Sequence, residues 1–490
     1  MSAQIDTDFE SVIGLEVHIQ LKTQSKMFCG CERAYFDTEP NSHVCVVCMG
    51  MPGSLPVINR QAVLYTVMAG LALNCNIPPQ AKFDRKNYPY PDLMKGYQIS
   101  QFDQPFCEEG TLLIQTDSGG ERNVQLERIH LEEDTARLIH RSDSEGSYSL
   151  LDLNRAGSPL MELVTKPDIQ SASEAASFLK RLRQLARYLD ISDANMEKGQ
   201  LRCDANISVR PKGTSELGTK VEIKNMNSFR SVQKAIDYEI SRQITQIRNG
   251  ERIVQETRGF IDSTGETVSQ RSKEGASDYR YFPEPDLPPL SLTDTFIDEV
   301  RSLMPELPNS RLSRFTTQYD LTPTEAITLT DSKFRSNAYE EAIRADDTVN
   351  PKEIAKWFIG EVAKHINELG VDAELSDTKV TPQQISRLVK LVESKEITNN
   401  AGREVLSEMF TDGHDPEDLV ESLGLRQNND TATLESAIRE VIENNPKAMA
   451  DYRGGKESAI GFLLGQTMRA TKGTADANIV RELLLKLINN

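Results

Sequence analysis

The sequence has no long apolar run, fewer basic than acidic residues, and an odd number of cysteines, seven. No segment approaches the roughly 18 apolar residues that cross a membrane, and the start, MSAQIDTDFESVIGLEVH, has neither a basic nor an apolar leader region. We therefore expect no membrane attachment and a cytoplasmic location. Lys and Arg number 56 against 74 Asp and Glu, which gives a net charge of −18. Charge alone does not let such a chain wrap nucleic acid, so we expect no DNA partner and only local contacts with RNA.

The chain is also too long, at 490 residues, for a single hydrophobic core. Residues 1–291 alternate strand-like segments with turns and a few helices, which is typical of an α+β fold with a mainly antiparallel sheet. The proline-rich stretch at 281–292 predicts a connector, and nearly all signals beyond it are helical. We predict a sheet-containing domain over 1–291, a linker and helical connector over 292–350, and a helical tail domain over 351–490.

Four of the seven cysteines lie close together: Cys29, Cys31, Cys45 and Cys48. Their spacing lets four thiolates converge on one ion, and Zn²⁺ suits such a closed sulfur site. A filled shell of four thiolates leaves no position for a substrate, so the insertion at 29–48 predicts a structural zinc site. Two alternatives stay open. The cysteines are simply buried thiols of a reducing compartment, or His43 replaces one of them as a ligand.

Acidic residues accompany histidines on segments that alternate like strands. One is Glu16-Val17-His18, where the outer two residues project from the same face because side chains alternate along a strand. Another is His130-Leu131-Glu132-Glu133-Asp134. Further carboxylates at similar positions are Asp152, Glu162 and Asp204. An oxygen-rich set with one imidazole suits Mg²⁺ or Mn²⁺ more than zinc, so we hypothesise a magnesium site. Each acid taken singly is typical of a solvated or salt-bridged surface group.

A loop from Phe83 to Pro105 mixes cations with aromatic side chains: Arg85, Lys86 and Lys95 with Tyr88, Tyr90 and Tyr97. Cations beside a carboxylate-bound Mg²⁺ are what phosphoryl transfer needs, because its transition state spreads negative charge over the phosphate oxygens. The segment 213–220 is not a P-loop, since its final Lys and Thr are reversed. No cysteine stands beside a candidate catalytic histidine, so any ammonia that is consumed must come from another chain.

Motifs along nearly the whole chain resemble one family. IGLEVHIQLKTQSKMFCGC, FDRKNYPYPDLMKGYQISQFDQP, RIHLEED, DLNRAGSPLMELVTKPD, LRCDANISVRP, EIKNMNSFRSV, QETRGF and DYRYFPEPDLPPL occur in this order. They are similar to the B subunit of the tRNA-dependent aspartyl/glutamyl amidotransferase. The similarity continues through KESAIGFLLGQTMRATKGTADANIVRELL, which resembles the YqeY-like tail of that family.

The resemblance implies a ligase of protein biosynthesis that acts within a heterotrimer. The A subunit, which is an amidase, would release ammonia from glutamine, and the small C subunit would complete the assembly. The B subunit would use ATP and Mg²⁺ to phosphorylate the side-chain carboxylate of Glu-tRNA(Gln) or Asp-tRNA(Asn), and ammonia would then displace the phosphate. The first domain would be a catalytic cradle of the glutamine synthetase/guanidino kinase fold, and the basic tail would bind tRNA.

The resemblance also implies roles for particular residues. The expected Mg²⁺ site, which is also the catalytic set, comprises Glu16, His18, Glu133, Glu162 and Asp204. Glu132 is the main rival to Glu133, because strand alternation from His130 favours it. Lys86 and Lys95 would face the phosphates of ATP, and Tyr88 would line the site. The chain departs from the family pattern at Met94 and at 134–137, both beside site segments.

Two competing hypotheses remain. A noncatalytic scaffold that docks tRNA would have lost part of the acidic set, which is intact here. A stand-alone ligase for a free small molecule would not need a basic helical tail, yet residues 451–490 carry six basic and four acidic groups. The sequence does not decide between the two tRNA substrates.

Overall fold

The computed structural model describes residues 8–144, 146–272, 279–370, 372–427, 430–453, 456, 458–471 and 474–489. The chain forms two compact units, Met1–Leu307 and Pro308–Asn490. Among the described residues, no helix combines the length and the apolar character that a membrane span requires.

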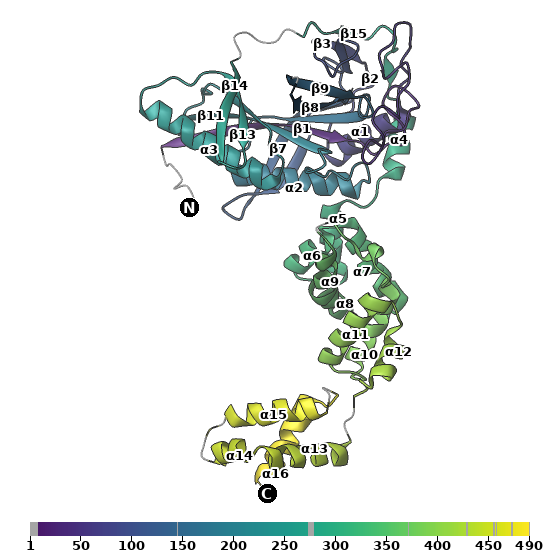
Figure 1. Ribbon diagram of the computed structural model, residues 1–490, viewed down its shortest axis with the longest axis vertical. Helices are drawn as coiled ribbons and strands as arrows, with labels where there is room; N and C mark the ends of the chain where they lie inside the picture. Colours follow the sequence, from purple (N-terminus) through teal and green to yellow (C-terminus); the bar gives the residue numbers. More distant parts are fainter. Residues whose placement is uncertain are drawn as a thin grey trace. The chain divides into compact units, whose positions relative to one another are not determined.

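A nine-stranded sheet organises the first unit (Figure 1). Its main path runs β14-β13-β12-β11-β1-β10-β7-β5, and β6 pairs with β7. In chain order these strands are β1 (Phe9–Gln20), β5 (Cys107–Glu108), β6 (Thr111–Gln115), β7 (Glu121–Glu133), β10 (Pro159–Thr165), β11 (Leu201–Pro211), β12 (Val221–Lys224), β13 (Glu256–Ile261) and β14 (Glu266–Ser272). Every pairing is antiparallel except that of β12 with β13, which confirms the expected mainly antiparallel sheet.

The central strand β1 shows why the sheet has one buried and one open face. Ile13, Leu15, Val17 and Ile19 are fully buried, and the residues between them project from the opposite face. The buried face packs against three helices, α1 (Arg60–Ala72), α2 (Ala172–Tyr188) and α3 (Phe229–Arg248). The open face is therefore free to carry polar residues.

Smaller sheets flank the large one. They are β15-β3-β4, with β15 (Phe282–Pro283), β3 (Asp84–Asn87) and β4 (Tyr97–Ser100), then β16-β2, with β16 (Leu290–Ser291) and β2 (Gln80–Ala81), and the hairpin β8-β9, with β8 (Arg137–Asp143) and β9 (Gly146–Asp152). The unit ends with helix α4 (Asp294–Leu303). Val300 of this helix is buried in the first core, so the compact unit extends past the prolines to Leu307, whereas the sequence predicted a boundary at 291.

The second unit contains only helices among its described residues, as predicted. Eight α-helices and two short turns surround one core: α5 (Pro308–Gln318), α6 (Pro323–Thr330), α7 (Lys333–Ala345), α8 (Pro351–Trp357), η1 (Phe358–Val362), α9 (Ala363–Leu369), η2 (Leu375–Asp377), α10 (Pro382–Glu393), α11 (Asn399–Asp412) and α12 (Pro416–Leu423). Proline follows the capping residue of α6, α8 and α10, where its missing N–H costs nothing.

A separate core holds the last four helices: α13 (Thr431–Asn444), α14 (Pro446–Arg453), α15 (Ser458–Ala470) and α16 (Ala477–Asn489). The apolar faces of α15 and α16 pack there, with Leu463 and Leu484 fully buried. The two helices contact each other, in agreement with the helical tail that the sequence predicts.

Candidate functional site

The open face of the large sheet carries a polar cavity of about 340 Å³. Strand β1 contributes His18 to it, β7 contributes Glu132, and β11 contributes Arg202 and Asp204. Lys86 at the β3 end also lines the cavity. These side chains come from segments almost 190 residues apart in the sequence, so only the strand order of the sheet brings them together.

His18 lies at the centre of a first cluster with two carboxylates. Its Nε2 is 3.3 Å from Glu162 Oε2 and 3.8 Å from Glu132 Oε1. The register explains the contact, because His18 pairs directly with Glu162 across β1 and β10. His130 Nε2 lies 3.1 Å from the same Glu162 oxygen. One imidazole and two carboxylates within reach of one point suit Mg²⁺ or a similar divalent ion.

The electrostatics of this cluster favour a cation. Burial lowers the pKa of His18, but the charge and hydrogen bond of Glu162, together with the charge of Glu132, outweigh it and raise that pKa to about 9. Burial raises the pKa of Glu162, but the charges and hydrogen bonds of His130 and His18 hold it well below its ordinary value. Positive charge at this point therefore stabilises the carboxylates.

A second cluster lies beside the first and consists of Glu16, Asp204 and Glu222. Burial raises the pKa of Glu16, and the neighbouring carboxylates raise it further, because three negative charges gather here. Lys224 Nζ partly compensates, at 2.6 Å from Asp204 and 3.3 Å from Glu222. Three carboxylates form an oxygen-only set, which is the set that Mg²⁺ prefers.

The structure places Glu132, and not Glu133, in the His18 cluster. Glu132 Oε2 accepts a hydrogen bond from Ser100 Oγ at 3.1 Å and stays on the open face with His18. Glu133 turns the other way, where it pairs with Lys95 and accepts a hydrogen bond from Ile99 N at 3.0 Å. Strand alternation from His130, which favoured Glu132, accounts for the difference.

Lys86 supplies the cation of the cavity. No carboxylate of the described chain lies within ion-pair distance of its ammonium group, which sits 5.0 Å from the ring centre of Tyr279 and 5.9 Å from that of Tyr88. Burial opposes its charge, but the nearby Glu132 and Glu162 raise its pKa above the ordinary value. Lys86 thus stays charged and available for an anion, and Tyr88 lines the same cavity, whereas Lys95 is already paired.

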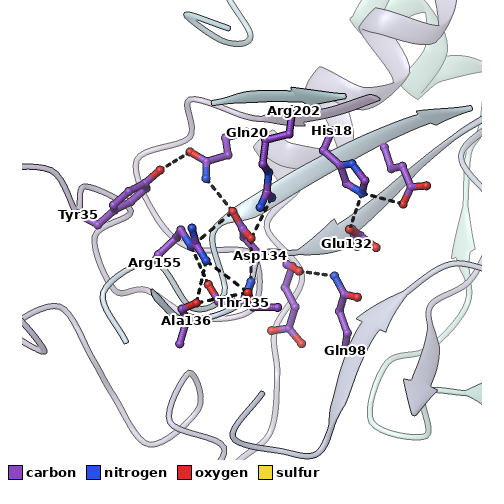
Figure 2. Close-up of polar contacts among 12 residues, drawn as sticks. His18, Gln20, Tyr35, Gln98, Glu132, Asp134, Thr135, Ala136, Arg155 and Arg202 are labelled. Atoms are coloured by element: carbon purple, nitrogen blue, oxygen red, sulfur yellow. Dashed lines mark hydrogen bonds and ion pairs between the residues drawn. The ribbon is translucent and has the colours of Figure 1, made fainter. Parts of the chain in front are cut away.

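Asp134 lines the cavity, and Figure 2 shows its polar contacts. Its carboxylate accepts hydrogen bonds from Gln20 Nε2 at 2.7 Å and Arg202 Nη2 at 3.1 Å. Arg155 donates to the backbone oxygens of Thr135 and Ala136 at 2.9 and 2.8 Å. The segment at 134–137, where the chain departs from the family pattern, is therefore held by two guanidinium groups.

The four predicted zinc ligands come together near the first unit's core. The sulfur atoms of Cys29, Cys31, Cys45 and Cys48 lie within 4.8 Å of one another. Tetrahedral zinc with Zn–S bonds of about 2.3 Å places sulfurs about 3.8 Å apart, and Cys45 and Cys48 are 3.9 Å apart. His43 points its Nδ1 at the Ala34 carbonyl oxygen, 2.8 Å away, and does not join the cluster. The donor set fits structural zinc.

The remaining predicted acid, Asp152, has another role. Its Oδ1 accepts backbone hydrogen bonds from Asn154 at 3.0 Å and Asn41 at 3.2 Å, so it shapes a loop and lies in neither acidic cluster. Conversely, the sequence reasoning did not select Glu222 or Lys224. The signal was present, because the two residues alternate on the strand TKVEIKN and share a face.

Members of two acidic clusters and the Lys86 ammonium line one cavity, which is the kind of arrangement that metal-dependent phosphoryl transfer uses. Comparison with known families agrees. A model described as the GatB/GatE catalytic domain matches residues 11–298, and a model described as the GatB domain matches 337–488. The chain therefore belongs to the GatB family.

Full-length relatives support this assignment. The B subunit of the aspartyl/glutamyl-tRNA(Asn/Gln) amidotransferase from Thermomicrobium roseum is 52% identical over 477 residues, which cover 97% of this chain and 98% of the relative. The proteins of the same name from Dehalococcoides mccartyi strain 195 and from Thermodesulfovibrio yellowstonii are 50% and 49% identical, and each comparison covers 98% of this chain and 99% of the relative.

Proposed function

We propose that this chain catalyses the ATP-dependent step of tRNA-dependent transamidation. It phosphorylates the side-chain carboxylate of Glu-tRNA(Gln), Asp-tRNA(Asn) or both, and a partner amidase, assembled with a small third protein, supplies the ammonia. The observation that carries the proposal is that residues of both acidic clusters, His18 and Glu132 of one and Asp204 of the other, line one cavity together with Lys86. The names of the relatives give the reaction, and the cavity offers the groups that its first step needs.

The chemistry explains why ATP is required. A carboxylate is a poor electrophile and has no good leaving group, so ammonia does not attack it directly. When a carboxylate oxygen displaces ADP from the terminal phosphorus of ATP, the product is an acyl phosphate. Ammonia then attacks the acyl carbon, phosphate leaves with the former carboxylate oxygen, and an amide remains.

The cavity residues have distinct tasks in this proposal. Glu132, Glu162 and His18 would hold one divalent ion, and Glu16, Asp204 and Glu222 a second. Bound Mg²⁺ would neutralise negative charge on the phosphate oxygens. Lys86 would contact those oxygens and Tyr88 would confine the substrate. Glu133 and Lys95 form an ion pair with each other and do not line this cavity.

The other parts of the chain complete the proposal. Zinc held by the four cysteines would stabilise the insertion at 29–48, and the sheet with its charged open face fits the glutamine synthetase/guanidino kinase fold. We further propose a cytoplasmic location. The tail would contact tRNA through exposed cations, among them Arg453, Lys456 and Arg469. Lys472, a further candidate, lies outside the described residues.

A reconstitution tests this function. The chain is assembled with its two partner proteins, supplied with ammonium as the nitrogen donor, and given ATP, Mg²⁺ and either misacylated tRNA. We expect amidated aminoacyl-tRNA and ADP to form in equal amounts. A complex that binds the tRNA but forms no ADP in response to it would contradict the proposal.

A further inference from the structure

Four aromatic rings lie in succession beside the cavity. Tyr88 contacts Tyr279 with ring centres 5.7 Å apart, Tyr279 contacts Tyr281 at 6.1 Å, and Tyr281 stacks on Phe102 at 4.5 Å with an angle of 12° between the planes. We call these four residues the aromatic row. They come from the loop at 83–105 and from the segment just before β15, which pairs with β3.

The aromatic row is not a buried core. Phe102 keeps 50% of its surface exposed and Tyr279 keeps 36%. At the other end of the row, Tyr88 lines the cavity, where its hydroxyl lies 3.2 Å from Gln98 Oε1. The row thus runs from the cavity to the solvent. Exposed aromatic rings next to a polar site mark a surface that binds a ligand or partner.

Positive charge accompanies the row. The Lys86 ammonium lies 5.0 Å from the Tyr279 ring centre. Arg128 Nη1 donates to the Phe102 carbonyl oxygen at 2.9 Å, and its buried Nε has no hydrogen-bond partner among the described residues. Aromatic faces with adjacent cations form the usual surface for single-stranded nucleic acid, because bases stack on the rings and phosphates meet the cations.

We propose that the aromatic row stacks the unpaired bases at the 3′ end of the aminoacyl-tRNA. The inference rests on the proposed function, since the amino acid is esterified to the terminal nucleotide and must reach the cavity from that end. The row leads outward from Tyr88, where the side-chain carboxylate would react, to Phe102 at the surface. Stacking does not distinguish bases strongly, which suits an enzyme that takes the same terminal sequence on different tRNAs.

The base of ATP is the rival occupant of this surface. A single nucleotide needs one or two ring faces, whereas the row offers four rings in sequence. Phe102, at the outer end of the row, belongs to neither acidic cluster and does not line the cavity. A chain of several unpaired bases uses this length better than one adenine.

Fluorescence tests the stacking directly in the assembled complex. Misacylated tRNAs carry 2-aminopurine at one of the unpaired 3′ positions in turn, and stacking on a protein ring quenches this base. We expect quenching with the wild-type complex and much less with Phe102→Leu or Tyr279→Leu, which keep an apolar side chain but remove the ring. Phe102→Tyr should restore it. Tyr148→Leu, a half-exposed tyrosine on β9 outside the row, is the matched control and should change nothing.

Steady-state kinetics distinguish whether the row binds the unpaired bases of the tRNA or the base of ATP. Losing one stacked base should raise the KM for aminoacyl-tRNA by about 5- to 150-fold and leave the KM for ATP unchanged. A raised KM for ATP with an unchanged KM for tRNA would overturn the inference and assign the row to the nucleotide base. Unchanged quenching and KM in both Leu variants would also overturn it. If the wild-type complex makes no amidated tRNA, the proposed function fails instead, and the two failures are thus distinguishable.

Discussion

The cysteine cluster and the acidic clusters of the first unit are built in opposite ways. All four cysteines come from one stretch of 20 residues, Cys29 to Cys48, and their sulfurs close on one another. The six residues of the acidic clusters come from five strands of the sheet, and three of them, His18, Glu132 and Asp204, line the cavity. A site made within one short loop serves that loop's stability, whereas a site made across strands stays open to a substrate.

The cysteine cluster and the acidic clusters also differ in their electrostatics. A hydrogen bond from Cys29 lowers the pKa of Cys48 to about 4 against the effect of burial, and the charge of Lys26 assists. Lys26 is completely buried and donates to the carbonyl oxygens of His43 and Leu153 at 2.8 and 3.1 Å. The protein thus supplies a fixed cation beside the cysteines. In the second acidic cluster, burial and the neighbouring carboxylates raise the pKa of Glu16. A bound cation would therefore stabilise the negative charge of this cluster.

The largest effect should come from a substitution in the two acidic clusters, which we call the open site. His18→Ala removes the imidazole at the centre of its cluster, and we expect ammonium-dependent amidation of misacylated tRNA to fall by at least about 100-fold, since even neighbours of metal ligands cost about 10 to 100-fold. Zinc content should not change. His140→Ala, an exposed histidine of the β8-β9 hairpin, is the control and should keep normal activity. Normal amidation by His18→Ala would refute the site assignment.

A substitution in the cluster of four cysteines, which we call the closed site, should instead lower the thermal stability of the protein. Cys45→Ser removes one of four sulfurs, so we expect loss of the zinc measured by metal analysis and a thermal midpoint lower by several degrees, because structural zinc contributes directly to folding. The folded fraction should keep its kcat. Cys75→Ser changes a buried cysteine outside the cluster and should retain the zinc. A zinc-free wild-type protein of full stability would show that the four cysteines are ordinary thiols.

The comparison also shows what the sequence could and could not predict. The cluster of four cysteines was predicted with all its members because the information is local. The strand alternation of β1 was predicted for the same reason. The open site depends on strand order and register, which no single segment contains. Glu222 was therefore missed, and Asp152 was grouped with acids that it does not meet.

The acids at 132 and 133 illustrate the limit most clearly. Alternation favoured Glu132 and the family motif favoured Glu133, and both residues are buried. Only the strand pairing places His18 and His130 on either side of Glu162, so that Glu132, two residues beyond His130 on β7, comes within 3.8 Å of His18. The aromatic row was out of reach for the same reason, since its two segments lie far apart in the sequence and meet through the pairing of β15 with β3.

An effect of intermediate size, on the Mg²⁺ requirement of the reaction, should distinguish the roles of Glu132 and Glu133. Glu132→Gln keeps the size of the side chain but removes a ligand charge, so we expect the Mg²⁺ concentration for half-maximal activity to rise by about 10-fold or more. Glu133→Gln weakens the pairing with Lys95 and should leave this Mg²⁺ requirement nearly unchanged. Titration of activity with Mg²⁺ measures both variants. The reverse order would return the ligand role to Glu133.

The smallest effect concerns stability of the open site. An ion present near its dissociation constant stabilises a protein by only about 0.4 kcal/mol, so removing Mg²⁺ should shift the thermal midpoint by less than about 2 °C. Activity should disappear and return when Mg²⁺ is restored. Stripping zinc should lower the midpoint by more. A large shift on Mg²⁺ removal would show that the acidic clusters are as structural as the cysteines.

The central claim is that the open site phosphorylates the substrate's own carboxylate. Isotope transfer tests it most directly: the misacylated glutamate carries ¹⁸O in its side-chain carboxylate, and the assembled complex converts it with ATP and ammonium. The account predicts one ¹⁸O atom in the inorganic phosphate for each amide formed, detected by mass spectrometry, and none with His18→Ala. Amide formation with unlabelled phosphate would contradict the acyl phosphate and with it the role assigned to the cavity.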